Sequence, residues 1–276
     1  MLEPLLLQTL IFATPLVLAA MGGFASERSG VVNIGLEGLM LTAACGSALA
    51  APLFGAGWAL VIALGLSVAL SLLHWLATQV YRVDHVISGM VINLLAVGGT
   101  RFALESGPSS DVAHLPVGLY EGLALAIPVV LWIYVRRSRG GLRLVATGAD
   151  PDKARLAGIV PERIRFVALV STGLFAGLGG VMLVAFTRGF TDNMTAGRGY
   201  IALAALVVGG WRPLPTLAAC LAFGFFGALN AQFSGGPLFG LALPSQFWAS
   251  LPYLATLIAL AGLLGRGRTP AGLGKP

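Results

Sequence analysis

Long apolar runs fill most of the chain, and charged residues, proline or glycine mark the places where each run ends. A helix of about 20 apolar residues is long enough to cross the hydrocarbon core of a bilayer. The run at 200–211 is too short for a complete crossing as a helix, so it is either a half-helix or a segment that extends through its polar flanks. The predicted segments are 4–22, 34–53, 58–79, 86–104, 117–135, 166–187, 200–211, 216–233 and 246–264. The pattern thus predicts an all-α polytopic membrane protein with eight to nine transmembrane segments and one transmembrane domain over 1–276.

The composition agrees with a location in lipid. Hydrophobic residues make up 57% of the chain and charged residues 10%, whereas about a quarter of the residues in a soluble domain are charged. The net charge of +6 does not indicate nucleic-acid binding, because the basic residues gather at the ends of the apolar runs. The spacing of Cys45, Cys220 and the three histidines is not that of a metal site. We expect His74, His85 and His114 at the membrane interfaces. No metal or cofactor is therefore expected on this chain.

The basic residues predict an orientation. Segment 136–165 is the longest polar stretch and is rich in arginine and lysine. Basic loops stay on the cytoplasmic side of a membrane, so this segment and the C-terminus are predicted to face the cytoplasm of a bacterium across its inner membrane. One interpretation is that this loop only sets the topology, and the other is that it binds a soluble partner.

Start and stop signals within this loop enclose one short helix. Asp150 suits the N-cap, Pro151 the first helical position and Gly158 the exit from the helix. Spacings of three and four residues would place Ala154, Ala157 and Gly158 on one face. Such a face of small residues fits a groove on another protein.

The sequence RLVATGADPDKARLAGI at 143–159 resembles the cytoplasmic coupling segment of ABC importer permeases. In that family a short helix of this segment docks on the ATP-binding subunit. The resemblance rests on the Ala-x-Gly at 146–148, the Asp-Pro at 150–151 and the Ala-x-x-x-Gly-Ile that ends at Ile159. It implies an ATPase-coupling role for Gly148, Asp150, Pro151, Ala154, Ala157, Gly158 and Ile159.

The sequence SERSGVVNIGLEGLMLTAA at 26–44 is similar to a signature of permeases that import nucleosides, within the branched-chain amino acid and simple-sugar permease family. With 84–98 and 197–211 the resemblance covers nearly the whole chain. It implies a helical bundle whose two halves form an inverted repeat. Two polar stretches interrupted by glycine lie near 30–38 and 197–210. They are candidates for broken or half helices at corresponding positions of the two halves.

Three polar residues are candidates for the solute path or its gate: Asn33, Glu37 and Asn93. A carboxylate in mid-membrane costs about 2.5 to 3.5 kcal/mol, so Glu37 should face the interior with a partner, for which Arg28 or Asn33 is expected. One interpretation places Glu37 on the solute path, and the other makes it a structural tie for a broken helix. For Asn93 an interhelical amide bond is favoured over a place on the path.

The chain has no Gly-x-x-x-x-Gly-Lys-Ser/Thr phosphate loop, so it is predicted to be a transport subunit and not an ATPase. The resemblance implies an ATP-binding subunit that carries ATP and Mg²⁺, a second and different permease chain, and an external solute-binding protein. The expected solutes are nucleosides or related sugar-like molecules. The alternatives are an ion-coupled secondary transporter with Glu37 as its proton or sodium site, and a membrane-embedded enzyme with a serine nucleophile.

Overall fold

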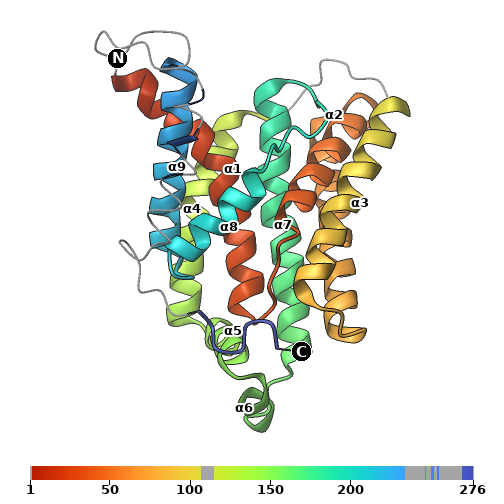
Figure 1. Ribbon diagram of the computed structural model, residues 1–276, viewed down its shortest axis with the longest axis vertical. Coiled ribbons are helices and arrows are strands. Elements are labelled where there is room, and N and C mark those ends of the chain that lie inside the picture. Colours follow the sequence, from red (N-terminus) through yellow and green to blue (C-terminus); the bar gives the residue numbers. More distant parts are fainter. Residues whose placement is uncertain are drawn as a thin grey trace.

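The computed structural model describes residues 2–106, 115–233 and 269–275, together with positions 246, 250, 251 and 254. In this part of the chain every regular element is a helix (Figure 1). His114 and nearly all of the predicted segment 246–264 lie outside it. The elements are α1 (Leu2–Arg28), α2 (Leu36–Trp75), a short π-helix η1 (Leu76–Val80), α3 (His85–Ser106), α4 (Val117–Arg137), α5 (Arg139–Ala149), α6 (Pro151–Leu156), α7 (Pro161–Thr187), α8 (Arg198–Val208) and α9 (Pro213–Phe233).

Six helices of the described residues are long and apolar enough to cross a membrane, and one of them, α2, is long enough to cross twice. Its 40 residues would span about 60 Å if straight, twice the hydrocarbon thickness of a bilayer. Gly55 breaks it with φ 78° and ψ 167°, a conformation that favours glycine. Gly46 lies against Ala63 and Leu66, so the first arm (36–54) and the second arm (56–75) form an antiparallel hairpin. These arms match the two segments predicted at 34–53 and 58–79.

Helices α1 and α7 form the centre of the bundle, and each has 27 residues. They run antiparallel, since the Thr172 hydroxyl donates to the Gly22 carbonyl at 2.9 Å while Gly179 lies against Pro15. Residues 13–27 of α1 are buried without interruption, as expected for a helix that is apolar on all sides.

Helices α2 and α8 both begin inside the molecule (Figure 1). The connector, residues 29–35, returns from the end of α1 before α2 starts, and residues 188–197 lead in the same way from α7 to α8. At 11 residues α8 is about 16 Å long, which confirms that the segment near 200–211 is too short to cross. A long helix, a connector and a helix that begins inside the molecule follow one another twice, in opposite directions, as in an inverted repeat.

Segment 136–165 forms a small layer beyond one end of the bundle (Figure 1). It contains two helices, α5 and α6, where the sequence pattern predicted one. Ser138 starts α5, because its hydroxyl accepts a hydrogen bond from the Gly141 N–H at 2.9 Å. The adjacent pair Gly140 and Gly141 concealed this helix in the sequence, because glycine has low helix propensity. Residues 269–275 pass beside α5 in the same layer.

Candidate functional site

The first helical turns of α2 and α8 meet at Glu37. Its Oε1 accepts a hydrogen bond from the Gly197 N–H at 2.7 Å, and its Oε2 accepts one from the Gly199 N–H at 2.6 Å. A helix N-terminus has unpaired N–H groups and a partial positive charge, so a carboxylate is favourable there. Glu37 is 4% exposed and thus joins two internal helix starts across 160 residues of sequence.

Asn93 of α3 hydrogen-bonds the backbone at the start of α2 in a similar way. Its Oδ1 accepts from the Gly38 N–H at 2.8 Å, while its Nδ2 donates to the Ile34 carbonyl at 3.0 Å and the Tyr200 hydroxyl at 2.8 Å. One amide side chain therefore satisfies the backbone at the start of α2 and holds α8 beside it. The interhelical amide bond favoured for Asn93 is present.

Asn33 completes the group from the connector. Its Oδ1 accepts from the Gly35 N–H at 2.9 Å, and its Nδ2 is buried with no hydrogen-bond partner in the described part of the chain. The expected pairing of Glu37 with Arg28 or Asn33 is wrong, because the glutamate binds backbone N–H groups of the α8 start. Sequence patterns cannot reveal this, since backbone donors look alike at every position.

We call this group the α2–α8 junction and define it by Asn33, Glu37, Asn93, Gly197, Gly199 and Tyr200. The structure brings all three predicted pathway candidates into it. A Cβ at position 199 would lie 2.5 Å from the Glu37 backbone nitrogen, so the close approach of α8 to α2 requires glycine there. Tyr200 was not singled out in the sequence, and at 47% exposed it is the accessible aromatic side chain of the junction.

Two histidines hold the connector that leads into the junction. The Val32 N–H donates to His85 Nδ1 at 3.2 Å, and the Val32 carbonyl lies 2.9 Å from His74 Nε2. The other ring nitrogen of His74 lies 2.9 Å from the Ser88 hydroxyl. His74 and His85 are therefore buried in the protein against the connector.

Arg165 of α7 is buried and joins three further segments. Its Nη1 donates to Gln79 Oε1 at 2.6 Å, its Nη2 to the Lys275 carbonyl at 2.8 Å and its Nε to the Ser29 carbonyl at 3.4 Å. The sequence pattern assigned this arginine to the basic polar segment 136–165. A buried guanidinium needs such acceptors, because desolvation of an unpaired charge is costly.

Residues 269–275 connect the loop layer with the connector. The Gly272 N–H donates to the Gly148 carbonyl at 2.9 Å, and the Gly274 N–H donates to the Gly30 carbonyl at 2.9 Å. Gly148 itself lies directly against the Arg28 carbonyl, which leaves no room for a side chain. The end of α5 is thereby joined to the segment that enters α2.

Helix α6 has the predicted start. Asp150 Oδ1 accepts from the N–H groups of Asp152 at 3.2 Å and Lys153 at 3.1 Å, and Pro151 occupies the first turn. The hydrogen bond from the Lys153 N–H, with the Lys153 ammonium 3.1 Å away, lowers the pKa of the Asp150 carboxyl below its usual value. Gly158 follows the helix with φ 76°, as a glycine at a helix exit should.

The predicted small-residue face of α6 needs correction. Ala157 and Gly158 are exposed, but Ala154 is 3% exposed and faces the protein. Leu156 is instead 90% exposed, which the spacing of the small residues did not predict. A single leucine in the run DKARLAG, between charged residues and glycine, is the signal that could have found it.

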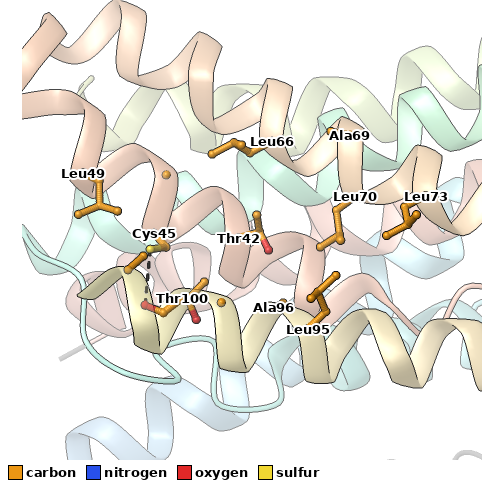
Figure 2. Close-up of a pocket in the computed structure, with 13 residues that line it drawn as sticks. Thr42, Cys45, Leu49, Leu66, Ala69, Leu70, Leu73, Leu95, Ala96 and Thr100 are labelled. Atoms are coloured by element: carbon orange, nitrogen blue, oxygen red, sulfur yellow. Dashed lines mark hydrogen bonds between the residues drawn. The ribbon is translucent and has the colours of Figure 1, made fainter. Parts of the chain in front are cut away.

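A cavity of about 540 Å³ lies between the two arms of α2 and α3 (Figure 2). Thr42 follows Gly38 by one helical turn and Ala96 follows Asn93 by almost one, so the cavity starts next to the α2–α8 junction. Its wall is mainly leucine, alanine and glycine, and the Cys45 thiol contacts the Thr100 carbonyl at 3.9 Å.

Comparison with known proteins agrees with this architecture. Residues 5–264 match the family described as branched-chain amino acid transport system, permease component. The guanosine ABC transporter permease protein NupQ of Bacillus subtilis is 36% identical, with 97% of this chain and 94% of NupQ covered. The nucleoside ABC transporter permease protein NupC of Lactococcus lactis is 32% identical, with 98% of this chain and 95% of NupC covered.

A solved structure of a metal-chelate type ABC transporter in an inward-facing conformation has the same fold. The TM-score is 0.52 at 14% sequence identity, and the match covers 95% of this chain and 86% of that one. Such low identity supports the fold alone. The family match and the relatives favour an ABC importer over the ion-coupled transporter considered from the sequence. The chain belongs to the permease-component family of branched-chain amino acid transport systems, and it is a membrane-spanning permease subunit of an ABC importer.

Proposed function

We propose that this chain carries nucleosides, or related sugar-like solutes, across a bacterial inner membrane, with energy from ATP hydrolysis on a partner subunit. The observation that carries the proposal is the physical link from α6, through the end of α5 and residues 269–275, to the connector of the α2–α8 junction. The substrates printed in the names of the relatives, guanosine and nucleosides, support the choice of solute.

The ATP-binding subunit would dock on α6. The exposed residues of this helix and its exit are Asp152, Lys153, Arg155, Leu156, Ala157 and Gly158. Leu156 is the large apolar side chain among them and is 90% exposed. An apolar side chain as exposed as Leu156 is typical of an interface anchor, which fills a pocket on its partner. This chain would bind neither ATP nor Mg²⁺, and both would sit on the partner.

Closure of the ATP-binding subunits would move α5 and α6 as a rigid body. Gly148 is packed against the Arg28 carbonyl and hydrogen-bonded to Gly272, so a shift of α5 would be passed to the connector. The connector contains Asn33 and leads directly to the start of α2. The solute path would then alternate between its two openings by a shift in the populations of two states.

The α2–α8 junction would contact the solute path. Glu37 and Asn93 hold its helix starts in place, while the exposed ring of Tyr200 supplies a flat surface on which a nucleobase can stack. The Tyr200 hydroxyl accepts from Asn93 and keeps its own proton for a ribose oxygen. In this proposal Glu37 and Asn93 act on the solute through Tyr200.

Two further partners belong to the proposal. A second permease chain, different from this one, would complete the path, and an external solute-binding protein would deliver the solute. Segment 136–165 and residues 269–275 would lie on the cytoplasmic side, and the excess of basic residues supports this orientation.

Co-purification with an ATP-binding subunit from the same genome, followed by uptake into proteoliposomes, tests the proposal. We expect the Leu156→Ala variant to bind that subunit about tenfold more weakly or worse, as for an interface anchor. Leu142→Ala, which truncates an exposed leucine of α5, is the matched control and should bind normally. ATP-dependent uptake of labelled guanosine is expected. Uptake of ribose without any nucleoside would move the assignment to the sugar-like solutes, and ATP-dependent uptake of neither would contradict the proposal.

A further inference from the structure

Three arginines from separate parts of the fold line one small cavity. Arg28 ends α1, Arg136 lies in the last turn of α4, and Arg212 lies in the turn between α8 and α9. The cavity measures about 270 Å³, and Trp132 and Trp211 form part of its wall. The function proposed above uses none of these side chains.

The positive charges in this cavity are not neutralised by its wall, which contains no carboxylate among the described residues. The ion pairs found in the described ranges all lie between residues 150 and 162, away from these arginines. Arg136 instead lies over the ring of Trp132, with its guanidinium carbon 4.7 Å from the ring centre. The Glu27 carboxylate accepts from the Trp211 indole N–H at 2.5 Å and is not part of the lining. Three arginines therefore line a space whose wall carries positive charge and suits an anion.

Beside this cavity, the part of α4 that leads into the membrane has an exposed apolar face. Val129, Ile133 and Arg136 follow one another at spacings of four and three residues, so they lie on one face of α4. Val129 and Ile133 are exposed, and α4 is one of the helices long enough to cross a membrane. Tryptophan and arginine at the end of such a helix are typical of the headgroup level of a bilayer. The anion that fits this place has a charged head and an apolar body.

We propose that the cavity of Arg28, Arg136 and Arg212 binds the phosphate of an anionic phospholipid, whose acyl chains lie along the exposed face of α4. A guanidinium group donates two parallel hydrogen bonds to a phosphate, so three of them can surround one phosphodiester. The bound lipid would join the end of α1, the end of α4 and the α8–α9 turn. It would thereby fix the point from which the connector starts. The proposal requires α4 to cross a membrane and is independent of the solute.

Native mass spectrometry of the permease purified with its partner subunits tests this site. The probes are dioleoyl phosphatidylglycerol, dioleoyl phosphatidylcholine and inorganic phosphate, each added to delipidated protein. We expect wild type to retain phosphatidylglycerol in preference to phosphatidylcholine, and Arg212→Gln to retain it about tenfold less. Arg137→Gln removes an equal charge from the neighbouring position, which does not line the cavity, and should behave as wild type.

Arg212→Lys separates a guanidinium site from a simple positive surface, because lysine keeps the charge but not the planar fork. We expect it to bind phosphatidylglycerol more weakly than wild type and more strongly than Arg212→Gln. Equal retention of both lipids, or unchanged retention in Arg28→Gln, Arg136→Gln and Arg212→Gln, would overturn the proposal. Binding of inorganic phosphate that displaces the lipid would show a site for free anions instead. Since bound lipid and not uptake is measured, these outcomes leave the transport proposal to its own test.

Discussion

At the scale of single residues, Glu37 and Asn93 show that a buried polar side chain in a membrane helix can be explained by the backbone around it. Both side chains satisfy N–H groups at helix starts that are buried inside the molecule. An unpaired donor costs more there than at a surface. Their first task is therefore to make two internal helix starts stable.

Glu37→Gln should destabilise the protein more than it alters solute binding. The variant keeps one acceptor oxygen but points an amide N–H at a second backbone N–H, so it loses a charge-assisted hydrogen bond worth about 1.5 to 3 kcal/mol. We expect a lower Tm in a thermal unfolding assay and an unchanged KM for uptake. Glu121→Gln on α4 serves as the control and should keep the wild-type Tm. A changed KM with an unchanged Tm would place Glu37 on the solute path.

Tyr200 is the junction residue for which we expect an effect on the solute itself. Stacking of a base on an aromatic ring is worth about 1 to 3 kcal/mol, so Tyr200→Ala should raise the KM for nucleoside uptake about tenfold or more. Tyr200→Phe keeps the ring and loses only the hydroxyl that donates to a ribose oxygen, a hydrogen bond worth about 0.5 to 1.5 kcal/mol, so it should raise the KM only a few-fold and less than Tyr200→Ala. Equal effects of the two substitutions would contradict stacking and point to the hydroxyl.

At the scale of elements, the connector and residues 269–275 are short irregular segments whose backbone groups are hydrogen-bonded by distant parts of the chain. The connector is hydrogen-bonded by His74 of α2, His85 of α3 and Arg165 of α7. It also accepts a hydrogen bond from the Gly274 N–H near the end of the described chain. Irregular backbone is tolerated at membrane depth only where protein surrounds it. These ties keep α5 and the start of α2 in one mechanical unit.

Removal of the Arg165 side chain should loosen this unit. Arg165→Gln leaves acceptors on Ser29, Gln79 and Lys275 without their donor, with an expected loss of about 2 to 3 kcal/mol of stability. Hydrogen exchange followed by mass spectrometry should show faster exchange at the amides of residues 272 and 274. The exposed Arg163, changed to glutamine, is the matched control. Unaltered exchange in Arg165→Gln would mean that backbone hydrogen bonds alone hold residues 269–275.

At the scale of the whole molecule, the two halves place their internal helix starts against each other. The unit of α1, connector and α2 meets the unit of α7, residues 188–197 and α8, and Glu37 hydrogen-bonds the start of α2 directly to the start of α8. The apolar cavity between the arms of α2 and α3 lies beside this link. A motion of one half relative to the other would therefore act on the junction and on the cavity together.

The sequence alone determined the class of fold and much of its detail, because lipid imposes a strong pattern. Apolar runs located the membrane segments, the short run ending near Trp211 indicated a half-helix, and the cap of α6 at Asp150 and Pro151 was readable from local chemistry. These features depend on neighbours in sequence, so residue types and spacing are sufficient to predict them.

Only the tertiary structure decided which side chains meet. The partners of Glu37 are backbone groups 160 and 162 residues away, and the inward face of Ala154 depends on how α6 lies on the bundle. The three arginines that line one cavity come from α1, α4 and the α8–α9 turn. Such contacts follow from packing between helices, which leaves no periodic trace along a single helix. The sequence therefore specifies where the chain crosses lipid, and the packing decides which polar groups then satisfy one another.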